Sequence, residues 1–515
     1  MTIVGNAAFA IASLLELQKI LRMLRYRVPL SLIVFGGLFG DGYGQFESSS
    51  FNLTGLAATT PFARDYQSLS VNPANLDLET GYDQKTTLGF FDFTASLYTE
   101  LLSKQELVNG VTSKTKAQPL SFSEQQAKVD ELTMKPTVMD VDLLSLGASF
   151  RSEKIGAFAF TMRQRVDFYS RIDRTLTELL WLGNQSSYFD SLIVQAASGA
   201  DSIIARPENF DPSQYNILSA FISSAQALSG QQLLGNTAIG FSWLQEFNLG
   251  YGKRIIQKDN FEFHMGIGAK YLLGQGVIEI NGERKEAFCA LSPLLNPFSS
   301  QLENTAQNPS SLPSDASSLK PVGQGFGFDI GATFLFKQHF IVNAAVNDIG
   351  QMRWNGNLFE LGTGKVTGFD DVGIETLDAN SVLNAFDGLD ALLNWKGEES
   401  RITRLNTTAR LGFGFEEQQK FRIGFDVIAP MNDNKANIQQ AAINAGIEVS
   451  PWPWLHLQTG FSDGGNYGRR MPAGIYFTVR EGAYELGVAT RDVLTYFTDD
   501  NPTLSMALGF LRFRL

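Results

Sequence analysis

Histidine and cysteine, which often act as nucleophiles, general bases or metal ligands, are rare in this chain of 515 residues. The three histidines are His264, His339 and His456, and the single cysteine is Cys289. The sequence contains no Cys/His cluster with metal-ligand spacing. One cysteine also excludes an intramolecular disulfide. These residues therefore predict neither a catalytic nor a metal site.

Two further motifs resemble ligand-binding sequences. The stretch GFGFDIG, residues 325–331, is rich in glycine, but no helix follows it as a phosphate-binding loop requires. The pair Asp370-Asp371 lacks the spaced oxygen ligands of a calcium loop, so solvated acidic side chains are the simpler interpretation. The sequence thus predicts no enzyme, no cofactor and no bound metal.

The dominant pattern is a period of two. In residues 261–271, Phe, Met, Ile, Ala and Tyr alternate with Glu, His, Gly and Lys, and residues 421–427 and 473–480 repeat the arrangement. Such alternation is typical of strands with one apolar and one polar face. The 40 phenylalanines and 48 glycines fit this pattern. Beyond the N-terminus, no apolar run reaches the ~18 residues of a membrane-spanning helix.

The alternating segments predict fourteen strands, an even number. Short connections such as RSEK, QKDN and FKQH regularly follow the even-numbered strands, and the long connections 99–138, 171–236, 282–322 and 355–402 follow odd-numbered ones. Sorting short turns to one end is typical of outer-membrane barrels. The expected fold is an all-β transmembrane antiparallel β-barrel of about 14 strands, with an N-terminal luminal plug and helical extracellular loops. The predicted strands are 85–98, 139–151, 154–170, 237–255, 261–281, 323–337, 339–354, 403–416, 420–431, 437–450, 454–464, 470–480, 483–493 and 503–514.

The N-terminus is typical of an export signal. Arg22, Arg25 and Arg27 precede the apolar run Val28 to Phe39, and the small residues of Gly42-Tyr43-Gly44 precede Gln45. We expect a cleaved signal peptide at 1–44, with Met23 as an alternative start, a plug at 45–84 and a barrel at 85–515. Without 1–44, 37 basic and 51 acidic residues remain, a net charge of −14. An exported acidic chain is a poor nucleic-acid binder.

Charged side chains should face the lumen, because a basic residue facing lipid at the bilayer midplane costs about 2–4 kcal/mol. Two interpretations are open: the charges pair across the lumen and hold a plug, or they form a path that favours anions. The predicted lumen-lining residues are Arg163, Arg165, Asp167, Glu262, His264, Lys270, Arg404, Arg410, Arg422, Asp426, Arg480, Glu485, Arg491, Arg512 and Arg514.

Three segments in the long loops have the apolar spacing of helices: Arg174 to Gly183, Tyr215 to Leu228 and Asp378 to Trp395. They could pack together as an extracellular cap, form a hydrophobic capture groove or contact another protein. For the capture groove, the candidate ligand-binding residues are Leu179, Leu180, Trp181, Phe221 and Ile222.

The motif Asn72-Pro73-Ala74, followed by Asn75, precedes the strand pattern. A plug with an Asn-Pro-Ala motif before fourteen strands resembles the long-chain fatty-acid transporter family of outer-membrane barrels, in which this segment is a hatch. Together with Val346 to Asn357, VNDIGQMRWNGN, it is also similar to an uncharacterised outer-membrane family of the Bacteroidota. That family is distantly related to the fatty-acid transporters and to the barrel shuttle protein of type IX secretion.

The C-terminal strand carries Leu511, Phe513 and Leu515 on one face, which resembles the signal read by the barrel-assembly machinery. We therefore expect a multi-pass protein of the cell outer membrane that contacts outer-membrane lipids. The predicted function is passive transport of a hydrophobic or amphipathic small molecule through the plugged barrel. The alternative is a non-transporting subunit of a secretion or assembly complex that binds proteins through its large loops.

Overall fold

The structure is a computed structural model. It describes residues 50–101, 103–105, 119–196, 198–293, 308–313, 320–374, 395–417, 420–435, 437–438, 440–465, 467–480, 482–498 and 501–515. The predicted signal peptide at 1–44 and most of the predicted helix at 378–395 lie outside these residues.

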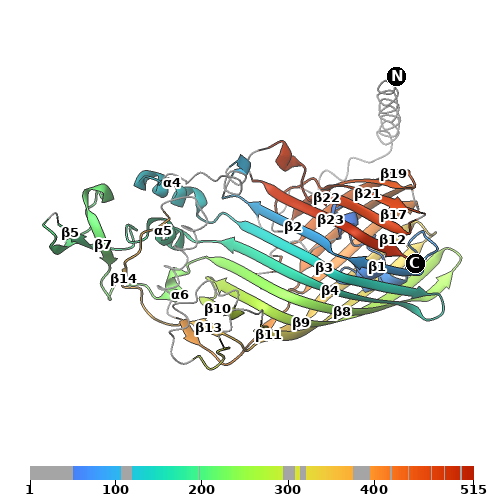
Figure 1. The fold of residues 1–515 in the computed structure, drawn as a ribbon, viewed down its shortest axis with the longest axis horizontal. Helices are drawn as coiled ribbons and strands as arrows, with labels where there is room; N and C mark the ends of the chain where they lie inside the picture. Colours follow the sequence, from blue (N-terminus) through green and yellow to red (C-terminus); the bar gives the residue numbers. More distant parts are fainter. Residues whose placement is uncertain are drawn as a thin grey trace, which may run out of the picture. The chain divides into compact units, whose positions relative to one another are not determined.

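Fourteen antiparallel spans close into a barrel within the described part of the chain (Figure 1). The first span is made of β1 and β2, which pair with β3 on one side and with the last strand, β23, on the other. Leu88 lies opposite both Ala148 and Phe513, which closes the wall. The barrel strands are β1 Thr86–Phe90, β2 Asp92–Thr99, β3 Thr137–Ser152, β4 Gly156–Arg171, β8 Ala238–Lys258, β9 Phe261–Asn281, β11 Gly323–Phe336, β12 Phe340–Trp354, β16 Arg401–Arg404, β17 Thr408–Glu417, β18 Phe421–Pro430, β19 Ala442–Trp452, β20 Leu455–Gly464, β21 Ala473–Val479, β22 Tyr484–Thr490 and β23 Thr503–Arg514.

These strands confirm the predicted fold class, and each corresponds in order to a predicted segment. The short connections, such as 259–260 between β8 and β9, share one end of the barrel, called here the turn side. The opposite end, the loop side, carries the long connections. The first span is interrupted at Phe91, which adopts a φ of +54°. Pairing with both neighbouring strands resumes beyond it.

The outer face of the wall is apolar. Leu249, Ile267, Phe326, Phe413 and Phe461 all point outward and are exposed. Such a surface is stable in contact with lipid chains and unfavourable in water. No helix among the described residues is long and apolar enough to cross a membrane.

The loop side carries a folded cap with its own apolar core. Helix α4, Phe122–Leu132, packs on α5, Arg174–Leu182. A four-stranded sheet adds β5, Ser191–Gln195, and β6, Asp201–Ala205. Its other strands are β7, Asn216–Phe221, and β14, Gly368–Phe369. Smaller elements on this side are α6 Gly230–Leu233, β10 Glu286–Leu291, β13 Leu358–Leu361, β15 Trp395–Gly397, η5 Pro212–Gln214 and η7 Leu494–Tyr496.

One predicted helix of the cap is wrong. The segment Tyr215 to Leu228 contains strand β7, which pairs with β5 and β14. Its apolar residues fit helical spacing, but strands distant in sequence satisfy its backbone hydrogen bonds, so tertiary pairing overrides the local pattern. The predicted helix beginning at Arg174 corresponds to α5.

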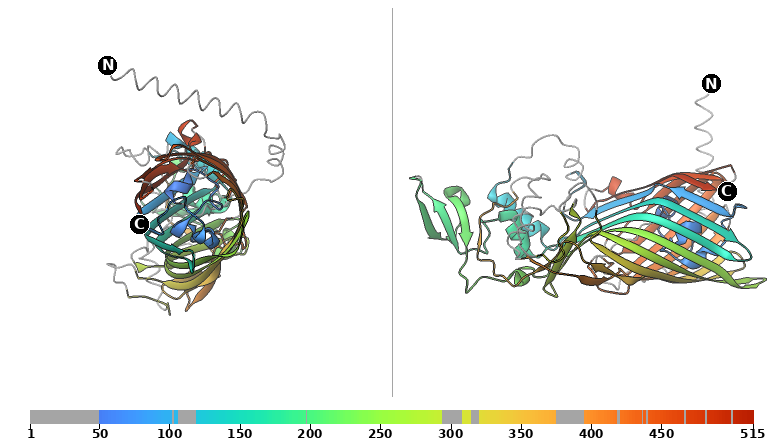
Figure 2. Two further views of the ribbon diagram at one scale, coloured as in Figure 1. Left: turned by 90° about the vertical axis from the view of Figure 1, so that its right-hand side faces the viewer. Right: turned by 60° about the horizontal axis from the view of Figure 1, so that its bottom comes forward.

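Residues 50–78, called here the inner segment, lie inside the barrel (Figure 2, left). The segment has three short helical turns: α2 Phe51–Thr54, η3 Asp65–Ser68 and η4 Pro73–Asp77. Every residue from 53 to 78 is buried. Such continuous burial of a segment without strands requires that the wall supply its hydrogen-bond partners.

Candidate functional site

The Asn-Pro-Ala-Asn motif attaches the inner segment to the wall through side-chain hydrogen bonds. Asn72 caps η4, since its Oδ1 accepts a hydrogen bond from the Ala74 amide at 3.1 Å, and Pro73 fixes the first helical φ. The Asn72 Nδ2 donates to Thr333 Oγ1 of β11 at 2.9 Å. Thr333 in turn donates to Asn75 Oδ1 at 2.7 Å. The motif is therefore bonded within itself and to the barrel wall.

Glycines in the wall allow this close approach. A Cβ at Gly331 would overlap Asn72 Oδ1, and a Cβ at Gly266 would overlap the backbone of Pro73. Gly266 of β9 and Gly331 of β11 thus leave room for the inner segment, whereas other glycines of these strands, such as Gly274 and Gly327, leave room for Trp354 and Leu405 of the wall.

A buried charge cluster lies on the interior wall towards the loop side. The Lys270 ammonium is 2.6 Å from a carboxylate oxygen of Asp348 and 3.1 Å from one of Asp329. The Arg165 guanidinium contacts Glu246 at 3.1 Å and Asp348 at 3.4 Å. Each charge has an opposite partner, as burial requires. Glu246 also accepts a hydrogen bond from Ser70 Oγ at 3.2 Å, which joins the cluster to the inner segment.

A bulge at Asp348 changes which residues of β12 face inward. Asp348 has a φ of +57°, and the β11–β12 register shifts at the same level. Asn347 before it is buried, and beyond it the phase reverses, so that Met352 and Trp354 are buried. The bulge thereby places two large apolar side chains in the interior, loop-side of the charge cluster.

These side chains line a cavity of about 50 Å³ on the loop side of the charge cluster. One part of its lining is apolar, with Leu244, Leu272, Val277, Met352, Trp354 and Leu405. The other part is charged or polar and includes Arg165, Asp167, Glu279, Asp348, Arg404 and Asn434. The lining is therefore amphipathic and could contact both an alkyl or aromatic group and an ionic group.

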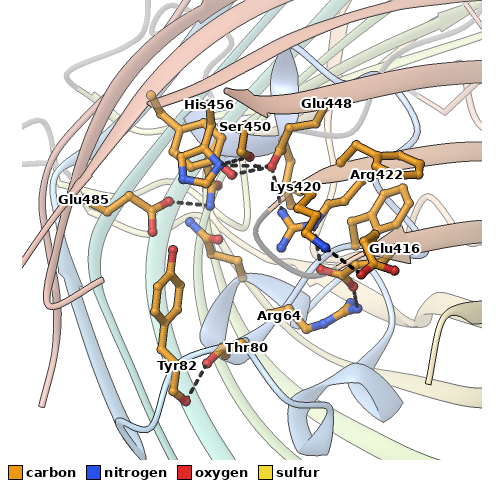
Figure 3. A pocket seen from close by; sticks show the side chains of 18 of the residues that line it. Arg64, Thr80, Tyr82, Glu416, Lys420, Arg422, Glu448, Ser450, His456 and Glu485 are labelled. Atoms are coloured by element: carbon orange, nitrogen blue, oxygen red, sulfur yellow. Dashed lines mark hydrogen bonds and ion pairs between the residues drawn. The ribbon is translucent and has the colours of Figure 1, made fainter. Parts of the chain in front are cut away.

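Ion pairs join the inner segment to the wall near the turn side. Arg64 contacts Glu416 at 2.9 Å, and Figure 3 shows the two side chains pointing towards each other. Asp65 contacts Arg512 at 2.5 Å, and Arg512 also pairs with Glu485 at 2.6 Å. Burial lowers the pKa of Arg64, while the charge of Glu416 opposes that shift. The middle of the inner segment is thus held to the wall by ion pairs.

Most of the predicted lumen residues lie in the interior. The structure buries Arg163, Asp167, His264, Lys270, Arg410, Asp426, Glu485, Arg491, Arg512 and Arg514, and half-buries Arg165, Glu262 and Arg422. Many are paired: Asp426 accepts a hydrogen bond from the Thr60 amide at 2.8 Å, and Arg491 contacts Asp140 at 2.6 Å. This arrangement corresponds to charges that hold a plug.

Arg480 and Arg404 differ from the prediction. Arg480 is exposed in the turn after β21 with a φ of +51°, because the strand ends at Val479, one residue earlier than expected. Arg404 is also exposed, although it lines the cavity on the loop side.

The proposed capture residues do not form an open groove. Leu179, Leu180 and Trp181 are buried in the core of the cap, while Phe221 and Ile222 are half-buried. Ile222 packs against that core. The apolar stripe of α5 is therefore covered by other parts of the cap.

Several site residues were not predicted from the sequence. Glu246, Asp329 and Asp348 complete the charge cluster, and Arg64 and Asp65 come from the inner segment. A carboxylate at an inward position of each strand was a usable signal for Glu246 and Asp329. The inward position of Asp348 depends on the bulge, and a bulge has no clear sequence signature.

The family model described as "Family of unknown function (DUF5723)" matches residues 217–480. The chain belongs to this family. No curated protein matches it. Among solved structures, the Pseudomonas putida toluene transporter TodX covers 92% of the chain, which covers 98% of TodX, at 9% identity and a TM-score of 0.38.

The Ralstonia pickettii toluene transporter TbuX gives 9% identity and a TM-score of 0.40, with coverages of 91% of this chain and 98% of TbuX. A Pseudomonas aeruginosa FadL homologue is 9% identical with a TM-score of 0.37, and the match covers 92% of this chain and 98% of the homologue. At these identities and TM-scores the likeness supports no conclusion about the function of this chain. The relation to a Bacteroidota family and to type IX secretion stays a prediction.

Proposed function

We propose that the chain is a passive outer-membrane transporter for an amphipathic small molecule, with the inner segment as its hatch. The observation that carries the proposal is the cavity on the loop side, where Met352, Trp354 and Leu405 face Arg165 and other ionic groups. An apolar wall beside fixed charges suits a molecule with an apolar body and an ionic end.

Passage requires the hatch to move. Residues 53–78 are all buried against the wall, and the cavity on the loop side has only about 50 Å³ of free volume. This is smaller than the ~300–1,000 Å³ of a drug-sized ligand site. The conformation described here is therefore a closed state, and the polar contacts of the hatch are exchangeable bonds that a displaced hatch could give up to water.

A reversible lock tests this proposal. In the double variant Asn72→Cys and Thr333→Cys, the two new thiols replace side chains whose Nδ2 and Oγ1 lie 2.9 Å apart. Oxidation should join the hatch to the wall by a disulfide. The full-length chain in lipid vesicles is then tested with a short-chain alkyl sulfonate, whose permanently charged head slows its passage through lipid itself.

We expect the reduced double variant to admit the alkyl sulfonate faster than protein-free vesicles, and oxidation to stop that flux. Each single cysteine variant is the control and should be insensitive to oxidation, since the native Cys289 is buried. Flux that is equal in the oxidised and reduced states would refute hatch movement. Flux equal to protein-free vesicles in both states would refute transport.

The alternative role as a subunit of a membrane complex has one specific support. Strand β6 is one edge of the cap sheet, and its Ile203 is 70% exposed. Open edges can pair with a strand of another protein. Purification in mild detergent distinguishes the roles, because a stoichiometric protein partner without any alkyl sulfonate flux would favour the subunit.

A further inference from the structure

A second cavity, of about 40 Å³, lies at the turn side between the inner segment and the wall (Figure 3). Asn52, Arg64 and Gln67 line it from the inner segment, and Arg512 and Arg514 of β23 line it from the wall. Lys420, which is exposed in the turn before β18, also lines it. The cavity therefore has a solvent-facing rim at the end of the barrel opposite the amphipathic cavity.

The acidic side chains of this cavity are already engaged. Glu416 contacts both Arg64 at 2.9 Å and Arg422 at 2.7 Å. Glu485 contacts Arg512 and Arg514, each at 2.6 Å. In the described lining, five basic side chains stand against four acidic ones, and Asp65, which contacts Arg512 from beside the cavity, balances the fifth.

Four buried nitrogen donors of this lining have no acceptor. They are the Nε atoms of Arg64, Arg512 and Arg514 and the Nε2 of Gln67. Among the described lining residues, no buried side-chain acceptor is left without a partner. Unpaired buried donors are rare in proteins because they lose their hydrogen bonds to water.

We propose that this cavity binds a compact oxyanion, a carboxylate or phosphate group, that arrives from the turn side. The ligand class follows from the imbalance in hydrogen bonding: four buried N–H donors of the lining lack an acceptor, three of them belong to guanidinium groups, and the described lining holds no buried acceptor that is free. An oxyanion accepts several hydrogen bonds and donates few, whereas water does both. The free volume suits a small ionic group rather than a long molecule.

The bound anion would bridge the two parts of the molecule, because Arg64 and Gln67 belong to the inner segment while Arg512 and Arg514 belong to the wall. A ligand that binds only when the inner segment is packed against the wall stabilises that packed state by mass action. The site is thus a ligand-dependent clamp on the inner segment. It does not depend on the proposed transport, since the amphipathic cavity shares none of these residues.

The test uses the full-length chain in detergent at pH 7 and constant ionic strength. Inorganic phosphate and acetate are titrated separately, and binding is followed by the NMR line width of each ion. Gln67→Met removes one donor, and Gln67→Glu places a carboxylate among the three guanidinium groups. Gln351→Met makes the same change at an exposed glutamine of β12 and serves as the control.

We expect saturable binding of at least one of the two ions. The dissociation constant should rise at least threefold in Gln67→Met and at least tenfold in Gln67→Glu, and should stay within twofold in Gln351→Met. Lys420→Met, at the exposed rim, should also weaken binding and provides a test if the Gln67 variants do not fold. The ion that binds more tightly identifies the preferred group. No saturable binding of either ion, or equal affinities in wild type and all three site variants, would overturn the proposal.

Discussion

Replacing Asn72 by alanine should loosen the inner segment while the barrel stays folded. The variant loses the Nδ2 bond to Thr333 at 2.9 Å and the Oδ1 bond from the Ala74 amide at 3.1 Å. The first is worth about 1 kcal/mol net, and leaving the buried amide without an acceptor costs about 1–3 kcal/mol. Thr333 keeps its hydrogen bond to Asn75, so no second buried polar group is left without a partner. The expected loss is about 2–4 kcal/mol.

Hydrogen exchange followed by mass spectrometry measures this loss locally. Since 1.4 kcal/mol is a factor of ten, amides of residues 53–78 should exchange about 30- to 1,000-fold faster than in wild type. Amides of β9 and β11 should change little. Asn216→Ala, an exposed asparagine in the cap, is the control and should leave the inner segment unchanged. Unchanged exchange of the inner segment, or equal acceleration in β11, would refute the reasoning.

Three other substitutions test separate parts of the structure. Gly331→Ala should displace the inner segment, because the added Cβ would overlap it, and amide hydrogen exchange at residues 72–75 should become faster. Gly468→Ala is the control, since only one atom lies within 4 Å of the Cβ added there. Lys270→Met leaves buried carboxylates without their cation and should lower the unfolding free energy in guanidinium by about 3–5 kcal/mol, with partial recovery when Asp348→Asn is added. Leu180→Ala should destabilise the cap by about 2–5 kcal/mol, so limited proteolysis should cut the loops faster at unchanged barrel stability.

The barrel strands could be predicted from the sequence because alternation is a local property. In β9, for example, each inward residue such as His264 or Lys270 is flanked by outward apolar residues, so the pattern identifies strand and face together. The order of the predicted strands was enough to locate the short connections at one end, because consecutive antiparallel strands alternate in direction. The polar face also identified most of the interior charges without knowledge of their partners.

What the sequence did not predict depends on contacts between distant residues. The bulge at Asp348 reverses the phase of β12, and strict alternation therefore misplaces Met352 and Trp354, which line the amphipathic cavity. Strand β7 becomes a strand through pairing with β5. The partners of the inner segment are distant in the chain, by 176 positions for Ser70 and Glu246 and by 352 for Arg64 and Glu416.

The glycine-lined interior has a consequence for engineering. Removing residues 50–78 would not produce an open version of the native barrel. Glu416, Asp426 and Arg512 would lose partners that only the inner segment supplies, and the wall at Gly266 and Gly331 would face solvent without side chains to fill the space. A deletion variant would therefore relax into a different lumen with a different charge pattern. Conductance measured on such a variant would describe that altered lumen, so the proposed transport is better tested with the intact chain and a reversible lock.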